Sequence, residues 1–453
     1  MESFSIRWRN FRSLEDTGWI PIRPLTVLIG SNGSGKTSFL APLLILKQTI
    51  DSLDDSLALR TRGDLFDAGS FQDAVTDRDT TRAMRLAVRL GEDLRGNDSA
   101  PLGKYPPGEV ELTFRTADDS SLPVLDQFEV RDVAGRVLVS RRRQASGRYT
   151  INLQLADTEP KLREAVLAAP PVQFLFSPEP VVRAAFADPS TAKKKDSRLA
   201  LRIDSATGLY FTVTSFVETR FRSILGGLSF LGPLRDHPRR VYLGLGEHPP
   251  DVGTRGEAAP EVIFRQRDRD LLERVNKWVR RFEFGVELRP VPLGPDAFAI
   301  ALIPDSSGPE LNLADCGFGL SQVLPLIVQG FYTPPSGFLV AEQPEIHLNP
   351  RLQTVLADLF CEVAASGRGV LLETHSEHLL LRLRRLVAEG QIEAGQVSLL
   401  YVEAAGRRST VREIPLSRSG HIEPAEWPKG FFEDSLRESL GLASAQSRGR
   451  RAR

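Results

Sequence analysis

Cysteine is nearly absent from this chain of 453 residues, and long apolar runs are missing altogether. The two cysteines, Cys316 and Cys361, lie far apart without the spacing of metal ligands. This argues against a zinc site or a disulfide framework and favours buried, reduced thiols. No apolar run approaches the roughly 20 residues that a membrane-spanning helix needs, and the N-terminus has no signal-peptide pattern. We therefore expect a soluble, cytoplasmic protein with no membrane segment.

An excess of charge of either sign is missing too. Lysine and arginine number 58, as do aspartate and glutamate, so the net charge is zero. This balance gives no sign of nucleic acid binding, although a local patch could still provide it. The run Lys193–Lys195 is more often a solvated turn than a DNA contact. Sustained heptads are also missing before residue 313, so no long coiled-coil arm is expected.

What the chain does contain is a phosphate-binding loop, Gly30–Thr37, with the spacing G-x-x-x-x-G-K-T. The apolar run Leu25–Ile29 precedes it as a buried strand, and Ser38–Leu46 follows as a helix with one apolar face. Strand, glycine-rich turn and helix start together aim backbone N–H groups at an anion. This predicts binding of ATP or GTP, with Lys36 at the β- and γ-phosphates and Thr37 on Mg²⁺. The predicted nucleotide-binding residues here are Asn32, Gly33, Ser34, Gly35, Lys36, Thr37 and Ser38.

The remaining patterns place this loop in a mixed α/β protein. Residues 82–155 alternate with a period of two, which predicts antiparallel hairpins, and residues 156–229 are largely helical in character. Apolar residues recur at helical spacing within Asp270–Phe282, which predicts a helix with one side facing the core. The arginine cluster in Phe230–Arg240 is equally compatible with a surface loop and with a phosphate or nucleic acid contact. Gln72 could sense Mg²⁺ and water, although a surface-loop glutamine is the preferred interpretation.

Three later segments carry groups suited to nucleotide chemistry. The apolar strand Gly337–Ala341 ends in the carboxylate of Glu342, an arrangement that holds Mg²⁺ beside a phosphate loop. Residues 313–322 form a glycine-rich loop that opens onto an apolar helix, which is a second potential anion site. The strand that begins at Gly369 is followed by His375. Each is weak alone, and their order around the phosphate loop gives them weight.

This order resembles the ABC-type ATPase clan, specifically its RecF, SMC and OLD-like branch. Four segments carry the resemblance: the opening Asn10–Ser13, the signature loop Gly317–Gln322, the Walker B and D-loop segment Glu342–Pro350, and the switch-histidine segment Glu373–Ser376. In the third segment Asn349 stands where the family commonly has a second histidine. A narrower subgroup, prokaryotic ATPases with a short C-terminal domain of unknown function and apparent links to phage defence, is similar at residues 230–240, 253–257 and 427–432.

The resemblance implies a P-loop NTPase fold of ABC-ATPase type with two lobes, an antiparallel β subdomain and a helical insertion. The expected domains are an N-terminal ATPase lobe with the phosphate loop and β subdomain (1–155), a mostly helical insertion (156–229), a C-terminal ATPase lobe (230–415) and a short C-terminal domain with a basic tail (416–453).

It also implies a homodimer or higher homo-oligomer with ATP at the interface, where Ser321 of one chain faces the γ-phosphate bound by Lys36 of the other. Glu342 would hold Mg²⁺ and His375 would contact the γ-phosphate. The family's catalytic glutamate position is occupied here by Gln343, which orients water but accepts no proton. Hydrolysis is therefore expected to be slow, or to use Glu345 as the base.

Two functional classes follow. In the first, the chain is an ATP-gated sensor or scaffold that regulates a separately encoded nuclease or toxin in phage defence. In the second, it is a RecF-like repair ATPase that binds DNA directly. The run Val397–Glu403 is similar to the first strand of the nuclease domain in OLD-like proteins. However, only about fifty residues follow, too few for a domain of typical size, and they contain no Asp-x-Asp pair.

Overall fold

The structure is a computed structural model that describes residues 4–91, 107–117, 122–152, 166–177, 206–244, 246, 248–265, 269–305 and 308–428. The lysine run Lys193–Lys195, residues 429–432 of the subgroup motif and the predicted basic tail lie outside the described residues. None of the described helices combines the length and apolar character that crossing a bilayer requires.

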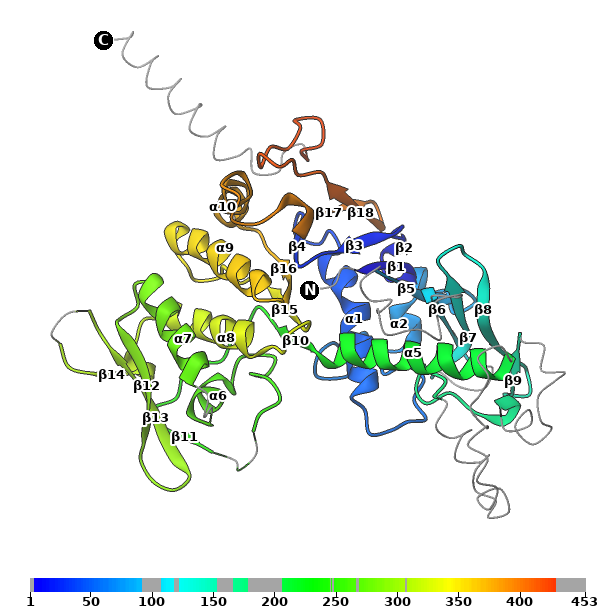
Figure 1. Cartoon of the computed structure of the whole chain (residues 1–453), viewed down its shortest axis with the longest axis horizontal. Coiled ribbons are helices and arrows are strands. Elements are labelled where there is room, and N and C mark those ends of the chain that lie inside the picture. Colours follow the sequence, from blue (N-terminus) through cyan, green and yellow to red (C-terminus); the bar gives the residue numbers. More distant parts are fainter. Residues whose placement is uncertain are drawn as a thin grey trace, which may run out of the picture.

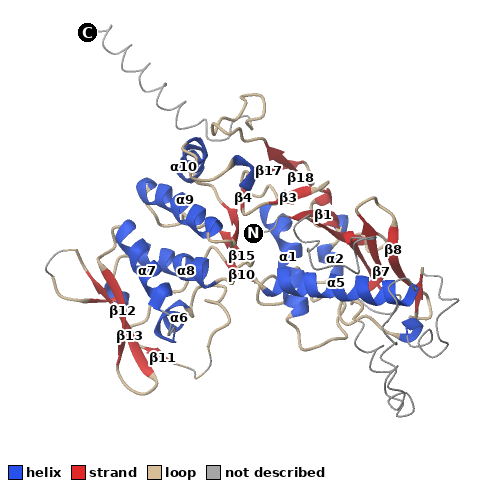
Figure 2. Ribbon diagram, viewed as in Figure 1, coloured by secondary structure: helices blue, strands red, loops and turns tan. Residues whose placement is uncertain are grey.

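A central six-stranded sheet forms the core (Figure 2), and five of its strands are parallel. Its order is β10 (Leu228–Leu231), β15 (Phe338–Glu342), β16 (Gly369–Glu373), β4 (Leu25–Ile29), β17 (Val397–Ala405) and β18 (Arg408–Ile414), with β18 antiparallel to β17. Every residue of β4, β15 and β16 is buried, as expected for parallel strands covered on both faces. The ends of these three strands therefore form one protected edge.

Helices cover the two faces of this sheet (Figure 1). They are α1 (Lys36–Ile50) and α5 (Ala206–Gly226) on one face, and α8 (Phe318–Tyr332), α9 (Pro350–Ala365) and α10 (Glu377–Ala388) on the other. Alternate residues of β4 enter different cores: Leu28 packs with α1, and Val27 with α8 to α10. The prediction that α1 has a single apolar face is wrong, because it is buried almost all round, including Gln48 and Thr49.

An antiparallel sheet flanks α1. Its strands are β1 (Phe4–Phe11), β2 (Leu14–Asp16), β3 (Ile20–Ile22), β5 (Met84–Leu90), β6 (Pro107–Thr116), β7 (Pro123–Asp132), β8 (Val137–Arg143) and β9 (Tyr149–Ile151). The predicted antiparallel hairpins are therefore confirmed.

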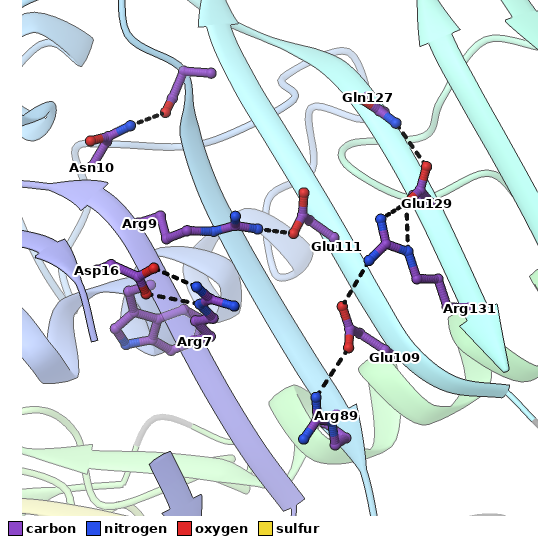
Figure 3. Close-up of polar contacts among 12 residues, drawn as sticks. Arg7, Arg9, Asn10, Asp16, Arg89, Glu109, Glu111, Gln127, Glu129 and Arg131 are labelled. Atoms are coloured by element: carbon purple, nitrogen blue, oxygen red, sulfur yellow. Dashed lines mark hydrogen bonds and ion pairs between the residues drawn. The ribbon is translucent and has the colours of Figure 1, made fainter. Parts of the chain in front are cut away.

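One face of this sheet carries a network of ion pairs between strands (Figure 3). It joins Arg7 to Asp16, Arg9 to Glu111, Arg89 to Glu109, and Arg131 to both Glu109 and Glu129. Each of these arginines is thus partnered by a carboxylate.

A smaller sheet with two helices lies at the other end of the molecule (Figure 1). It comprises β11 (Tyr242–Leu243), β13 (Ala297–Ile303), β12 (Glu287–Pro292) and β14 (Leu311–Asn312), with α6 (Ala259–Arg265) and α7 (Arg269–Arg281). The core stripe predicted for α7 is present, since Val275, Trp278 and Val279 are fully buried. The described part of the chain also contains short helical turns: α2 (Phe71–Ala74), η1 (Thr76–Arg78), η3 (Leu313–Asp315) and η4 (Ala394–Gln396).

Two sequence expectations need refinement. Gln72 is exposed on the short helix α2 rather than in a loop. Within 156–229 the described residues include α5, but Val172 and Leu175 form an isolated β-bridge rather than helix.

The α/β P-loop fold with an antiparallel β subdomain is confirmed, whereas the domain boundaries stay a prediction. The strand β4 precedes the phosphate loop in the N-terminal part of the sequence, yet it lies in the central sheet between β16 and β17.

Candidate functional site

The phosphate loop joins β4 to α1, and its lysine lies inside the protein. Lys36 is only 4% exposed, and its Nζ donates hydrogen bonds to the carbonyl oxygens of Gly30 (3.1 Å) and Ser31 (2.9 Å). Burial lowers the pKa of Lys36, and the nearby carboxylate of Glu373, whose Oε1 lies 3.8 Å from Nζ, opposes this shift. The cation of Lys36 is therefore held by carbonyl oxygens of the loop itself.

Close neighbours explain two of the glycines in this loop. A Cβ on Gly30 would lie 2.3 Å from the carbonyl oxygen of Val402, and one on Gly35, whose φ is 102°, would lie 2.4 Å from Ser409 Oγ. Ser34 is fully buried, and its Oγ has no hydrogen-bond partner within the described part of the chain. The residues at the apex of the loop, Ser31, Asn32 and Gly33, are exposed, and so is Thr37. The loop therefore has an exposed outer part and one buried hydroxyl, that of Ser34, without a hydrogen-bond partner in the described chain.

Two carboxylates end adjacent parallel strands next to this loop. Glu342 at the end of β15 is the register partner of Glu373 at the end of β16. Thr37 Oγ1 lies 3.5 Å from Glu373 Oε2. Burial and then the charge of Glu373 raise the pKa of Glu342 to about 7, and Lys36 opposes the shift. Burial also raises the pKa of Glu373. Glu373 was not among the predicted site residues, although it ends an apolar strand in the same way as Glu342 does.

The other predicted catalytic residues lie at the same edge. Glu345 Oε1 accepts a hydrogen bond of 2.6 Å from the backbone N–H of His375, and burial raises the pKa of Glu345. Burial and then the charge of Lys36 lower the pKa of His375, which favours the neutral imidazole. Gln343 is partly exposed with φ of 44°, and its backbone N–H is bonded to the Glu373 carbonyl at 2.7 Å.

The arginine cluster after β10 is divided between two environments. Arg240 forms an exposed, two-pronged ion pair with Asp315, as a surface loop would. Arg235 is buried, donates from Nη2 to the Glu342 carbonyl at 3.2 Å, and has no hydrogen-bond partner for Nε or Nη1 within the described chain. Burial lowers its pKa to about 10, opposed by Glu345. The sequence left two interpretations of this cluster open; in the structure Arg240 pairs with Asp315 at the surface, whereas Arg235 is buried and contacts the backbone at the end of β15.

The signature segment lies at the start of α8. Ser321 Oγ donates to the carbonyl oxygen of Phe318 at 2.7 Å, and Ser321 lines a cavity of about 30 Å³ together with Asp236 and His237. That volume suits one or two water molecules. Among the described residues no hydrogen bond or ion pair connects Ser321 to the phosphate loop. The structure thus brings together Lys36, Thr37, Glu342, Glu345, Glu373 and His375, and it places Ser321 elsewhere.

The hard oxygen donors at this edge fit Mg²⁺. The described residues contain no group of three His, Cys, Asp or Glu side chains arranged as metal ligands. Mg²⁺ beside a nucleotide normally uses one or two protein oxygens, with phosphate and water completing its shell. The Thr37 hydroxyl and the two strand-end carboxylates supply oxygen donors of this kind, and the carboxylate beside Thr37, at 3.5 Å, is that of Glu373.

Comparison with known proteins gives a family and a set of distant structures. The model of the family "AAA ATPase domain" matches residues 1–130 and 265–380, together more than half of the chain. A family described as "Protein of unknown function (DUF3696)" matches residues 392–442. No curated protein matches the sequence.

Among solved structures, an SMC head bound to the C-winged helix domain of ScpA has a TM-score of 0.42 and 13% identity, over 91% of this chain and 98% of that one. The SMC head domain from Thermotoga maritima has a TM-score of 0.38 and 12% identity, over 91% and 99%. The assignment itself rests on the family model and on the phosphate loop described above. This chain belongs to the AAA ATPase domain family.

Proposed function

We propose that this chain binds ATP with Mg²⁺ at Gly30–Thr37 and hydrolyses it slowly. One observation carries the proposal: Lys36 and Thr37 share the carboxyl edge of the central sheet with Glu342 and Glu373. Ligands of open α/β sheets bind at this edge. The backbone N–H groups of the loop and the start of α1 would hold the phosphates, and Lys36 would exchange its carbonyl partners for phosphate oxygens.

Each neighbouring residue has a role in this proposal. Thr37 and Glu342 would hold Mg²⁺, which neutralises the negative charge that develops during phosphoryl transfer. Gln343 would orient the attacking water, and the neutral imidazole of His375 would donate a hydrogen bond to the γ-phosphate.

Acceptance of the water's proton is the weak step in this arrangement. Gln343 accepts no proton, and Glu345 already holds the His375 N–H through Oε1. Its Oε2 is buried and accepts no well-aligned hydrogen bond within the described chain, although the nearby Thr374 favours the charged carboxylate. That oxygen is therefore left for the proton. Glu373 is engaged by Lys36 and Thr37. A site with positioned charges but a compromised base favours tight binding with slow turnover.

At the molecular level we propose an ATP-gated switch. Two copies would pair with ATP between them, Ser321 of one facing the phosphates bound by the other, and the pairing would regulate a separately encoded nuclease or toxin in phage defence. Such a switch needs nucleotide occupancy more than rapid turnover. Co-expression with the products of neighbouring genes, followed by mass analysis of the complex with and without ATP, tests the effector. An effector that binds equally in both conditions would contradict gating.

Direct DNA binding, as in a repair ATPase, receives no specific support. The arginines of the charged sheet face in Figure 3 are each paired with a carboxylate, which reduces the positive charge that this face offers to phosphate groups.

Replacement of Lys36 tests nucleotide binding itself. Lys36→Ala removes the cation at the phosphates, and we expect affinity for a fluorescent ATP analogue to fall by at least about a hundredfold, because charge-assisted phosphate contacts are among the strongest. Lys47→Ala is the matched control: Lys47 lies on the same helix α1 and pairs with Asp51 instead of the loop. Equal affinities of wild type and Lys36→Ala would remove the basis of the proposal.

A further inference from the structure

The β17–β18 hairpin lies in the region matched by the family of unknown function, and it borders the phosphate loop. Its first strand pairs in parallel with β4, residues Val397–Tyr401 lying opposite Leu25–Ile29. Figure 1 shows both strands of the hairpin beside β3 and β4. The region therefore begins as part of the ATPase sheet, not as a separate body. The segment Val397–Glu403, which is similar in sequence to a nuclease strand, is an inner strand of the central sheet in this structure.

Both ends of the phosphate loop rest on this hairpin. The carbonyl oxygen of Val402 leaves no room for a side chain at Gly30, and Ser409 leaves none at Gly35. Ser409 is itself fixed by Ser13: its Oγ donates to Ser13 Oγ, and its N–H donates to the Ser13 carbonyl, both at 2.8 Å. The hairpin thus sets the position of the loop backbone.

The tip of the hairpin is tied to the N-terminal part of the chain. The guanidinium of Arg408 donates to both carboxylate oxygens of Asp77, at 2.8 and 2.6 Å, and lies 3.4 Å from Glu15. Glu15 lies on β2, two residues after Ser13, and Asp77 lies on η1. The segment before η1 contacts the segment before β2, since the Arg12 N–H donates to the Ala74 carbonyl at 2.7 Å. Arg408 therefore holds the hairpin against the same segment that Ser409 contacts.

The chain beyond the hairpin contacts helix α10. Arg384 on α10 donates from Nε to the carbonyl oxygen of Gly420 at 3.0 Å, and its guanidinium lies 6.0 Å from the ring of Trp427. Helix α10 begins directly after His375, with Ser376 as its N-cap. One continuous region thus contacts both the phosphate loop and the helix that follows the switch histidine.

We propose that the β17–β18 hairpin positions the phosphate loop, with Arg408 and Ser409 as its positioning residues, and that nucleotide binding and hairpin docking strengthen each other. The physical reason is preorganisation: the N–H groups of the loop converge on an anion only while its backbone keeps one shape. Coupling between two sites is reciprocal, so a bound nucleotide must also stabilise the hairpin. This inference rests on the proposed nucleotide binding and assigns a role to a region of unknown function.

A matched pair of arginine variants tests it. Arg408→Gln removes the ion pair with Asp77, in which the side chain of Arg408 is 29% exposed and that of Asp77 is 38% exposed. Arg7→Gln removes a closely similar pair with Asp16 on β2, at 31% and 38% exposure, and leaves the Arg408–Asp77 and Ser409–Ser13 contacts of the hairpin in place (Figure 3 shows the Arg7–Asp16 pair). We expect Arg408→Gln to weaken binding of a fluorescent ATP analogue roughly three- to tenfold, in the range of coupling between linked sites. Arg7→Gln should leave the affinity unchanged within about twofold.

A second variant and a second measurement separate positioning from general stability. Ser409→Val places methyl groups against Gly35, and it should also weaken binding while Arg7→Gln does not. Hydrogen exchange of the wild type should slow in residues 397–414 on addition of the ATP analogue with Mg²⁺, but not in the β7–β8 hairpin of the other sheet. A purely structural hairpin would give lower melting temperatures with unchanged affinity.

The outcomes distinguish the two proposals. If the wild type binds nucleotide and all three variants bind equally, the positioning role is wrong and the proposed function stands. If the wild type does not bind nucleotide, the proposed function fails and this inference fails with it.

Discussion

The residue after Glu342 controls how the proposed site handles the attacking water. We predict that Gln343→Glu raises the rate of phosphate release about tenfold at saturating ATP, because it adds a base where only a positioning amide exists. Glu345→Gln should lower the wild-type rate if Glu345 is the substitute base. Gln391→Glu, which makes the same change of charge at an exposed residue after α10, is the control. If the wild type hydrolyses ATP fast and neither substitution changes the rate of phosphate release, the base lies elsewhere.

The pKa of Glu342 makes a pH-dependent prediction. Burial and Glu373 raise this pKa from its ordinary 4.5 to about 7, so the folded protein loses stability as the pH rises from 4.5 to about 7, because the unfolded chain ionises Glu342 first. Without nucleotide or Mg²⁺, Glu342→Gln should therefore increase the free energy of unfolding by roughly 1–3 kcal/mol at pH 8. The gain should shrink below about 1 kcal/mol at pH 5, where the carboxyl of the folded wild type is already protonated.

Urea unfolding at the two pH values measures this difference. Glu377→Gln, a change at the first residue of α10, is a comparison for the loss of one glutamate near the same edge. A gain from Glu342→Gln that is the same at pH 5 and pH 8 would show that the pKa of Glu342 is not raised in the folded protein.

At the scale of residues, the sequence predicted those site residues whose role can be recognised from the spacing of their neighbours in the chain. Lys36 and Thr37 follow from the loop pattern, and Glu342 from an apolar strand that ends in a carboxylate. Glu373 ends its strand in the same way, but its importance comes from pairing beside Glu342, and that register is a property of the assembled sheet. The burial of Lys36 likewise depends on strands that are distant in sequence.

At the scale of elements, alternation along a strand separates residues that look alike in sequence. Arg141 and Arg142 are neighbours in β8, yet Arg141 is fully buried and Arg142 is exposed. The guanidinium of Arg141 donates at 2.9 Å to the carbonyl oxygens of Val166 and Ala169 and to the Tyr210 hydroxyl. It thereby joins the antiparallel sheet to residues 166–177 and to α5.

This arrangement predicts a large difference between two equivalent substitutions. Arg141→Ala leaves three buried acceptors without their donor and should lower the free energy of unfolding by about 2–4 kcal/mol. Arg142→Ala, on the outer face of the same strand, should change it by less than about 0.5 kcal/mol. Chemical unfolding followed by circular dichroism measures both values. Similar losses for the two variants would mean that Arg141 does not hold these elements together.

Element types were predictable where periodicity is strong, as for the stripe of α7 and the hairpins β5 to β9. The character of α1 was not. Its apolar residues suggested one buried face, but α1 lies between the central sheet and the antiparallel sheet and is covered on nearly every side. A helix that is packed between layers shows its full burial only when the layers are known.

At the scale of the whole molecule, the central sheet is assembled from segments far apart in sequence. The strand β4 from the N-terminal part lies between β16 and β17 from the C-terminal part. Resemblance to a known clan supplied the fold class, whereas composition alone supplied only a large α/β protein. The strand order could not be predicted from local pattern, because it depends on which apolar strands meet in the folded core.

The proposed ATP-dependent pairing belongs to this scale, and the signature loop offers a clean way to test it. Ser321 is only 6% exposed, so Ser321→Arg disturbs the start of α8 as well as any partner surface. Gly317 is a better position. Its φ of −57° suits any residue, and a Cβ built there meets nothing within 4 Å. An arginine at residue 317 would therefore be accommodated within one chain and would project from the loop that should face the partner's nucleotide.

We predict that Gly317→Arg retains binding of the ATP analogue but loses the ATP-dependent dimer, because a long cation would occupy the space between the loop and the opposed phosphates. Ser321→Arg should lose the dimer too. Gly294→Arg is the control: it lies in the β12–β13 turn of the same lobe, and its Cβ also meets nothing within 4 Å. Light scattering with ATP and Mg²⁺ should give a dimer mass for wild type and Gly294→Arg, and a monomer mass for Gly317→Arg. Normal dimerisation of Gly317→Arg with bound nucleotide would exclude this loop from the interface.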